Sequence, residues 1–320
     1  MKILSLAAVA LSFALSGPVA AQDFPNRPIT LVMPFQAGGV ADLFGRLVSD
    51  KMGGLLGTKF IVVNNAGAGG VIGGQVVANA KPDGYTILYA TDTVMVNHPL
   101  VTKNPLFIPE KAFAPIHSLT TTPWMFAVHP DAPYKTFREV VEFARKNPGK
   151  LNYFILDIGS SHHVMGELLQ KAAGVKFTHV PYKGGPQGFV DFFGGRLELM
   201  MDYANTWAPH VAAGKAIPIG VASTARLGVA PNVPTFVEQG YDVAFGPIGV
   251  LAAPIATPKP LIDKLSETMA QVHKDPAFVK YCFERGSVQL LYGPAETKVF
   301  LDQRTTRMRQ LFAELGIKPQ

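Results

Sequence analysis

The chain has 320 residues, 48% hydrophobic and 16% charged, so it can bury a substantial core in two domains or one large one. Its formal net charge of +6 suits an anionic ligand, but it has no run of Lys or Arg that would indicate nucleic-acid binding. The single cysteine, Cys282, excludes an internal disulfide and a cysteine-based zinc site. We expect it to be a small buried hydrophobic residue.

Residues 1–21 have the pattern of a secretory signal peptide. Lys2 gives a positive start, Ile3 to Leu15 form an apolar segment, and Val19-Ala20-Ala21 offers small residues for cleavage. The apolar segment is too short to span a bilayer. Gln22, and not a cysteine, follows the predicted cleavage site, which argues against a lipid anchor. We therefore expect a secreted, soluble protein that begins at Gln22.

Short apolar segments alternate with amphipathic segments from residue 29 onward. The predicted strands are 29–33, 60–64, 85–90, 124–128, 150–154, 177–181, 197–202, 217–222 and 248–252. The predicted helices include one from about 41 to 57, one after a Thr136–Glu139 capping box, and 261–274, 276–284 and 296–315.

The first three predicted strands and the helices between them form a βαβαβ pattern. This pattern predicts a parallel sheet with right-handed crossovers. The whole chain predicts an α/β fold with two lobes, each a mostly parallel sheet flanked by helices. Residues 22–122 and 245–320 would form lobe 1, and residues 123–244, inserted into it, would form lobe 2 with a cleft between them.

The segment 34–46 (PFQAGGVADLFGR) contains a strand end, two glycines and the start of a helix. In an open α/β sheet, ligands bind at the carboxyl ends of strands, where helix N-termini offer positive charge and unpaired N–H groups. Gly38 and Gly39 allow close approach to the backbone, and Asp42 either caps the helix or meets its dipole favourably. The pattern indicates an anion site, although a tight turn without a ligand explains the glycines equally well.

The glycine-rich segment 66–73 does not fit a dinucleotide site. Gly67 and Gly69 begin a G-x-G pattern, but Ile72 occupies the third glycine position and the next glycine is Gly73. No Walker motif occurs in the sequence. We therefore predict no cofactor.

Residues 159–163 (GSSHH) form another candidate anion-binding loop. Ser160 has the position of a helix N-cap, and no G-x-S-x-G elbow indicates a hydrolase nucleophile. His163 and Glu167 share a helix face, but two possible ligands are too few to predict a metal site. A secreted serine hydrolase that uses Ser160 or Ser161 stays open as an alternative.

A series of short motifs extends over nearly all of the mature chain. They are Pro34-Phe35-x-Ala37-Gly38-Gly39-x-x-Asp42, Gly67-Ala68-Gly69-Gly70, Pro82-Asp83-Gly84-Tyr85-Thr86, Asn152-Tyr153, Gly159-Ser160 with His163, Val180-Pro181-Tyr182-Lys183-Gly184, Asp202, Gly214-Lys215 and Pro231-x-Val233-Pro234-Thr235. In order and spacing they resemble the Bug-type periplasmic solute-binding receptors of tripartite tricarboxylate transporters.

The resemblance implies a Venus flytrap whose two lobes close on a small carboxylate without catalysis. It implies that backbone N–H groups of the first loop and ordered water hold one carboxylate group. The ligand-binding residues that it implies by position are Phe35, Ala37, Gly38, Gly39, Asp42, Gly67, Ala68, Gly69, Gly70 and Thr91 in lobe 1, and Ser160, His163, Tyr182 and Asp202 in lobe 2. The implied partners are the membrane subunits of such a transporter. We expect a monomer with no nucleic-acid partner.

Residues 154–157 depart from that family, which has small or hydroxyl residues and a glycine where this chain has Phe154-Ile155-Leu156-Asp157. If the segment faces the cleft, Ile155 adds an apolar wall and Asp157 repels a second carboxylate. We therefore add Ile155 and Asp157 to the predicted site. The expected ligand is an aromatic or other apolar-bodied mono- or dicarboxylate. Packing of these side chains behind the strand, and a receptor that feeds a sensor kinase, stay open as alternatives.

Overall fold

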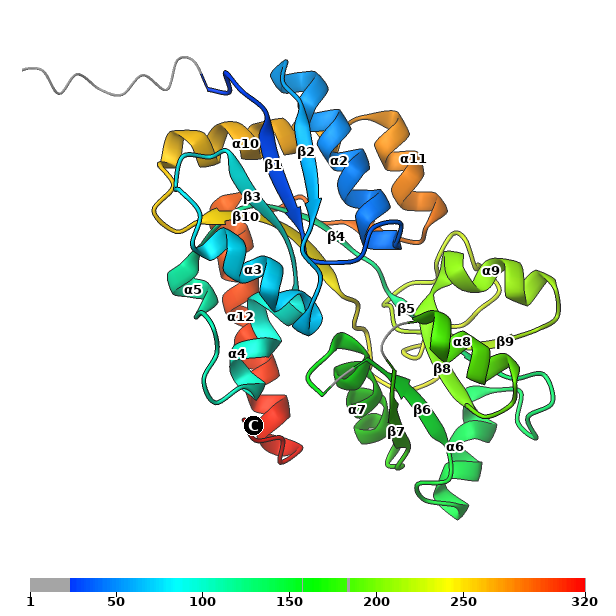
Figure 1. Ribbon diagram of the computed structural model, residues 1–320. Coiled ribbons are helices and arrows are strands. Elements are labelled where there is room, and N and C mark those ends of the chain that lie inside the picture. Colours follow the sequence, from blue (N-terminus) through cyan, green and yellow to red (C-terminus); the bar gives the residue numbers. More distant parts are fainter. Residues whose placement is uncertain (1–23, 157, 183–184, 320) are drawn as a thin grey trace, which may run out of the picture.

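The computed structural model describes residues 24–156, 158–182 and 185–319, which form two lobes, each built on one β-sheet (Figure 1). The predicted signal peptide and Asp157 lie outside the described residues. Among the helices described, none is both long enough and apolar enough to cross a membrane.

The sheet of lobe 1 has six strands in the order β11-β4-β10-β3-β1-β2. Their bounds are β1 Ile29–Met33, β2 Phe60–Asn64, β3 Thr86–Thr91, β4 Phe113–Thr121, β10 Ile248–Pro254 and β11 Val288–Gln289. The pairing directions show that β1 to β4 run one way, and that β10 and β11 run against them. The predicted parallel arrangement is therefore present, but β10 interrupts it.

Helices cover both faces of this sheet. This is required because successive side chains of β1 point to opposite faces, and nearly all of them are buried. Their bounds are α2 Val40–Leu56, η2 Ala68–Gly70, α3 Val71–Ala78, the π-helical turn η3 Thr93–Asn97, α4 His98–Val101, α5 Pro109–Ala112, α10 Lys259–Val272, α11 Pro276–Glu284 and α12 Pro294–Glu314. Ile29, Leu31 and Met33 pack against α2, α10 and α11, whereas Val32 faces α3 and α12. Cys282 is buried on the first of these faces, as predicted.

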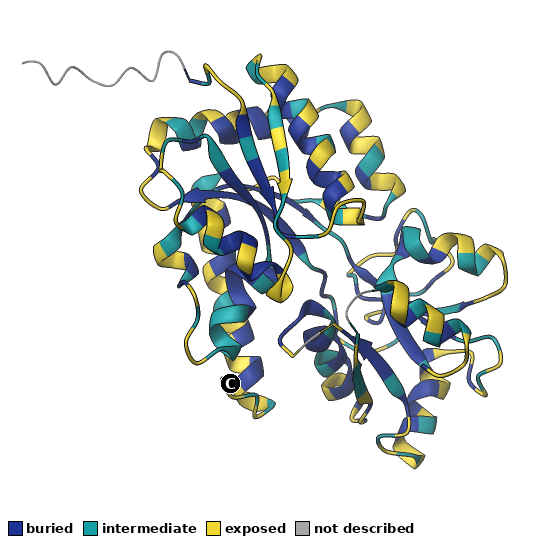
Figure 2. Ribbon diagram, in the orientation of Figure 1, coloured by how far each residue is buried: buried dark blue, intermediate teal, exposed yellow. Residues whose placement is uncertain are grey.

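The sheet of lobe 2 has five strands in the order β7-β6-β8-β5-β9, and four of them run in one direction, with β5 opposed. The elements are β5 Trp124–Val128, α6 Phe137–Lys146, β6 Asn152–Ile155, α7 Ser161–Ala173, β7 Thr178–Pro181, α8 Gly185–Phe193, β8 Leu199–Tyr203, α9 Ala204–Ala212 and β9 Ile217–Val221. The helices α6 and α7 cover one face, and α8 and α9 cover the other. Figure 2 shows the resulting pattern, with buried strands inside and helices exposed on their outer sides.

Two crossings connect the lobes, between β4 and β5 and between β9 and β10. The crossings are joined, because the Thr122 N–H donates to the Pro247 carbonyl at 3.2 Å. Asp92 at the end of β3 accepts from the Ile248 N–H at 2.8 Å and forms a buried ion pair with Arg304 of α12. Arg304 also donates to the Gly246 carbonyl at 2.7 Å. Lobe 1 therefore fixes the second crossing by a charged network.

The predicted α/β two-lobe fold is confirmed, and the predicted strands match the observed ones to within a few residues. The capping box is confirmed as well, with the Glu139 N–H donating to Thr136 Oγ1 at 3.3 Å. The strands β4 and β11 and the turn η3 were not predicted. The exact lobe boundaries at 122/123 and 244/245 stay predictions.

Candidate functional site

The helices α2 and α7 begin directly after β1 and β6, at the carboxyl ends of parallel strands in the two lobes. Figure 1 shows these strand ends directed toward the junction between the lobes. A helix N-terminus leaves backbone N–H groups unpaired and carries partial positive charge. The fold therefore places two anion-attracting helix starts at one junction.

Asp42 holds the first loop in place. Its carboxylate is buried and accepts from the Gly38 N–H at 2.9 Å, from Arg46 Nε at 2.9 Å and from Asn64 Nδ2 at 2.8 Å. The same Asn64 amide donates to the Phe35 carbonyl at 2.9 Å. Burial alone would raise the pKa of Asp42, but these hydrogen bonds outweigh it and lower the pKa to about 2. In this structure Asp42 acts on the loop, and its oxygen atoms are already occupied.

The predicted loop residues Ala37, Gly38 and Gly39 are exposed at the start of α2. Gly38 has φ +81°, a left-handed conformation that favours glycine. Gly39 has an extended backbone, and a Cβ there would meet only the Gln36 carbonyl, at an ordinary 3.5 Å. The two glycines therefore differ: Gly38 is required by the turn, and Gly39 keeps the helix start open.

The second glycine loop packs behind the first one. Ala68, Gly69 and Gly70 all have positive φ, and a Cβ on Gly70 would lie 3.2 Å from Pro34. Gly69 would similarly collide with Thr93, at 2.9 Å. Thr91 is partly buried at the end of β3, two residues before Thr93. The loop 67–70 therefore lies beside Pro34, at the start of the first loop.

In lobe 2, Ser160 is the N-cap of α7, and its hydroxyl accepts from the His163 N–H at 3.3 Å. His163 is buried, and its Nδ1 accepts from the Gly159 N–H at 3.1 Å. Both predicted residues therefore shape the loop that begins α7. The Ser160 hydroxyl serves as the cap of α7 in this arrangement.

One hydrogen bond ties this loop to lobe 1. The buried Asn97 of η3 donates from Nδ2 to the Gly159 carbonyl at 3.0 Å. Gly159 has φ +80°, and a Cβ there would lie 2.8 Å from Val101 of α4. The start of α7 is therefore packed directly against lobe 1. The sequence analysis missed Asn97, Asn64 and Arg46, although a polar residue at a strand end, such as Asn64, is a signal that could have been used.

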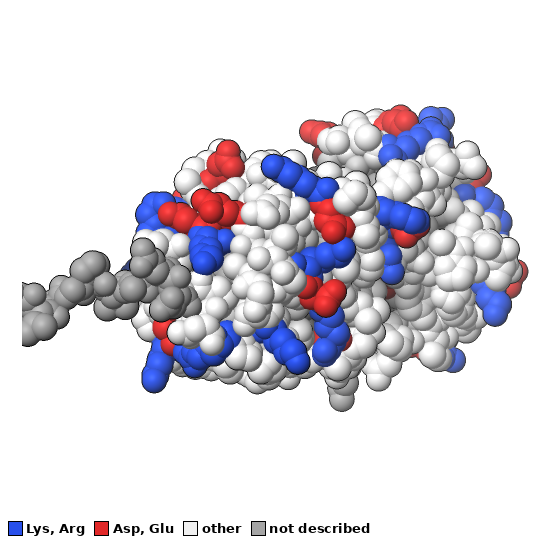
Figure 3. All heavy atoms as spheres, turned by 90° about the horizontal axis from the view of Figure 1, so that it is seen from above, with Lys and Arg blue, Asp and Glu red and all other residues white. Residues whose placement is uncertain are grey.

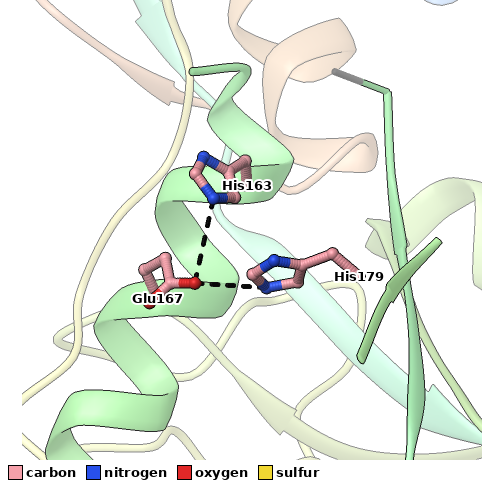
Figure 4. A group of neighbouring side chains, drawn as sticks. All are labelled: His163, Glu167 and His179. Atoms are coloured by element: carbon pink, nitrogen blue, oxygen red, sulfur yellow. Dashed lines mark ion pairs between the residues drawn. The ribbon is translucent and has the colours of Figure 1, made fainter. Parts of the chain in front are cut away.

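His163, Glu167 and His179 lie close together, as Figure 4 shows. Glu167 Oε1 is 3.8 Å from His163 Nε2 and 3.4 Å from His179 Nε2, and two histidines with a carboxylate are a zinc-type donor set. However, the Gly159 N–H needs a lone pair on His163 Nδ1, so the ring proton is on Nε2, the atom that would have to bind the metal. Gln170 Nε2 also donates to Glu167 at 3.2 Å. The cluster fits a hydrogen-bonded structural link better than a metal site.

Tyr182 and Asp202 have different surroundings. The Tyr182 hydroxyl donates to Asp191 at 3.0 Å, and the ring stacks on Phe154 at 5.3 Å. Asp202 accepts from the Tyr203 N–H at 2.6 Å, and its burial raises its pKa to about 6. A carboxyl group that titrates this close to neutrality at the end of β8 is a candidate polar contact for a ligand. The Tyr182 hydroxyl, in contrast, already has a partner in Asp191.

The prediction that Ile155 lines the ligand site is wrong. Its side chain is 3% exposed and packs with Tyr153 and Met165 under α7, and Phe154 is fully buried on the opposite face of the sheet. Leu156 and Ile158, in contrast, are 38% and 47% exposed. Any apolar wall formed by this segment is therefore made by Leu156 and Ile158. Asp157 lies outside the described residues.

Two concave surfaces lie away from these loops. One of about 1480 Å³ is lined by the end of α2, the start of β2 and the end of α10, and one of about 480 Å³ lies between α5, α10 and α12. Neither includes a residue of the predicted site. Figure 3, which views the molecule from above lobe 1, shows basic and acidic side chains interspersed on that face. The predicted loops at the helix N-termini therefore lie apart from both concave surfaces.

Comparisons with known proteins identify the family and agree with the two-lobe fold. Residues 44–317 match the model of the tripartite tricarboxylate transporter family receptor. A UPF0065 protein of Bordetella pertussis is 31% identical over 316 residues, covering 98% of this chain and 97% of its own length. The structure of the periplasmic binding protein BugD has a TM-score of 0.83 and 32% identity, covering 93% of this chain and 100% of its own. An R. palustris protein with adipate has a TM-score of 0.86 and 27% identity, with coverages of 93% and 100%.

Proposed function

Since this chain belongs to the tripartite tricarboxylate transporter receptor family, whose members with solved structures include solute-binding proteins, we propose that it captures a small carboxylate between its lobes. The proposed ligand is an aromatic or other apolar-bodied mono- or dicarboxylate. The protein delivers it from the periplasm to the membrane subunits of a tripartite transporter. It binds this ligand without turnover.

The observation that carries the proposal is the pair of helix starts at the lobe junction, α2 behind the loop 34–39 and α7 behind residues 158–160. One helix terminus contributes about 0.3–1 kcal/mol to anion binding, and up to about 2 kcal/mol when partly buried. Micromolar affinity needs about 8 kcal/mol. Several groups from both lobes must therefore converge on the ligand, and closure must exclude water.

Two similar solved structures contain dicarboxylates: the R. palustris protein with adipate, which has an apolar body, and MatC from Rhodopseudomonas palustris with malate, which carries a hydroxyl. The exposed Leu156 and Ile158 beside the start of α7 favour an apolar ligand body, like that of adipate, in this chain. A citrate-like ligand would place additional carboxylates against these side chains, at a cost of several kcal/mol unless each were paired.

Calorimetry with purified mature protein tests the proposal. We expect benzoate, terephthalate or adipate to bind with one-to-one stoichiometry, to raise the thermal midpoint, and to be recovered unchanged by NMR. Citrate should bind more weakly than the best of these acids. Catalytic consumption of a bound acid, or tightest binding by citrate, would contradict the proposal.

A further inference from the structure

Trp124 and Tyr203 are cross-strand neighbours at the edge of the lobe 2 sheet that faces lobe 1. Trp124 is the first residue of β5 and pairs in register with Tyr203, the last residue of β8. Their rings are stacked, with centroids 4.7 Å apart and planes at 15°. His162, in the first turn of α7, packs on Trp124 at 4.5 Å. The three rings therefore form a continuous row that ends at the helix start proposed to bind a carboxylate.

A second set of rings lies in lobe 1. Tyr89 of β3 contacts Phe35 of the first loop, with centroids 6.5 Å apart and planes at 79°. It also contacts Phe44 in α2 at 6.2 Å. Tyr89 is 7% exposed, and a Cβ on Gly249 would lie 2.9 Å from its hydroxyl. These contacts hold Tyr89 next to the loop that begins α2.

Both sets lie beside the crossings between the lobes: Trp124 is two residues after Thr122, which donates to the Pro247 carbonyl, and the Tyr89 hydroxyl lies against Gly249. Burial raises the pKa of Tyr203, and the nearby Tyr89, Asp202 and Asp92 raise it further. Two of these groups, Tyr89 and Asp92, belong to lobe 1. Burial also raises the pKa of Tyr89, so both hydroxyls are protonated donors at neutral pH.

The hydroxyls of Tyr89 and Tyr203 lie beside the junction. No hydrogen bond joins either of them to another residue that the structure describes. The indole Nε1 of Trp124 is likewise buried without a partner within the described part of the chain. Buried donors are normally paired, so this indole N–H, beside the stacked ring of Tyr203, indicates a missing acceptor at the junction.

We propose that Phe35, Tyr89, Tyr203, Trp124 and His162 form an aromatic row between the two helix starts, which selects a carboxylate with a flat aromatic body. The tyrosine rings contact the body, and their hydroxyls donate to its oxygen atoms. The inference rests on the proposed function and specifies its ligand. A benzene ring with carboxylates at opposite ends fits, because each carboxylate can reach one helix start while the ring lies against the row.

Calorimetric titration with terephthalate and adipate separates the ring from the carboxylates, because both are dicarboxylates with their charges at opposite ends. Wild type should bind terephthalate at least about tenfold more tightly than adipate, the size expected of one or two aromatic contacts. Tyr203→Ala should reduce this preference about tenfold while adipate affinity changes little. Tyr203→Phe should keep the ring preference and lose only the hydroxyl contact.

Tyr292→Ala is the matched control, because Tyr292 is a partly exposed tyrosine that packs on Phe300 in lobe 1, outside the row. Its preference should equal that of wild type. Thermal unfolding should verify that each variant is folded. If Tyr203→Ala does not fold, Tyr203→Leu takes its place and should show the same loss.

The fluorescence of Trp124 is an independent readout. Terephthalate should change tryptophan emission in wild type and much less in Trp124→Phe, where Trp207, bonded inside the core to the Met125 carbonyl, is the remaining indole. Adipate binding as tightly as terephthalate to wild type, or an unchanged preference in the Tyr203 variants, would overturn the inference but leave the receptor function standing. Failure of every tested acid to bind wild type would overturn both.

Discussion

Replacing Asp42 by asparagine tests whether the first loop is held by a charged hydrogen-bond network. The substitution keeps the shape of the side chain but puts an NH₂ group where an oxygen accepts. One oxygen accepts from both Gly38 and Arg46, and the other accepts from Asn64. Either orientation of the new amide therefore places a donor against a donor. Asn64 cannot rotate freely to compensate, because it also bonds the Phe35 carbonyl.

The magnitude follows from the pKa of Asp42. A change from 3.8 to about 2 corresponds to about 2 kcal/mol of stabilisation of the ionised form. Arg46 is 47% exposed and partly screened by water, so we expect about 1–2 kcal/mol. The folded-state pKa lies below the unfolded value, so this contribution is complete above about pH 4 and is lost as the pH falls through about 2. About half should remain near pH 3.

Urea denaturation of wild type and Asp42→Asn at pH 7 and at pH 3 measures this contribution. The difference in unfolding free energy should be about 1–2 kcal/mol at pH 7 and about half of that at pH 3. Carboxylate affinity should fall as well, because the loop backbone is no longer fixed. Asp50→Asn, an exposed substitution on the same helix, is the control. Equal stability of Asp42→Asn and wild type at both pH values, with unchanged affinity, would refute the role of Asp42.

Three further variants test other parts of the molecule. Gly39→Asp should abolish carboxylate binding, because it places a negative charge at the start of α2. Gly39→Ala should keep most of the wild-type affinity, because its Cβ has room. Equal affinity of the two variants in calorimetry would place the ligand elsewhere. Asp202→Asn should raise the unfolding free energy by about 2 kcal/mol at pH 7 but not at pH 4. The reason is that the pKa of Asp202 is raised to about 6, so its ionised form destabilises the folded state increasingly between pH 4 and pH 6. A gain in unfolding free energy that does not depend on pH would contradict this. Arg304→Gln leaves Asp92 buried without its cation and should cost about 3–5 kcal/mol, while the exposed Arg307→Gln on the same helix should cost almost nothing in the same denaturation experiment.

The strongly patterned elements of the fold were predictable from the sequence. The strands 60–64 and 124–128 and the helix 276–284 have the predicted bounds, because apolar runs and an Asp-Pro start mark them clearly. The strand β4 was missed because Pro115 and the polar run around His117 do not resemble a buried strand. Its place is set by pairing with β10, from more than one hundred residues later in the chain.

The candidate site was predictable in position but not in detail. Strand ends and glycines indicated the loops at Gly38 and Gly159, because parallel strands present their carboxyl ends at one edge. The roles of Asp42 and His163 depend on which hydrogen-bond partner each one meets in three dimensions, and periodicity does not contain that information. The same holds for Tyr203, whose neighbours across the junction come from the other lobe.

The position of β10 has a consequence for how the chain acquires its structure during synthesis. This strand lies between β3 and β4 in the lobe 1 sheet, but it is made after all of lobe 2. The first 121 residues therefore cannot join their strands into one sheet until β10 has been synthesised, and the edge strand β11 follows later still, whereas lobe 2 has all its strands available before β10. Contacts that are so distant in sequence form slowly. The N-terminal third of the chain therefore stays incompletely folded longest, and the sheet of lobe 1 is completed after that of lobe 2.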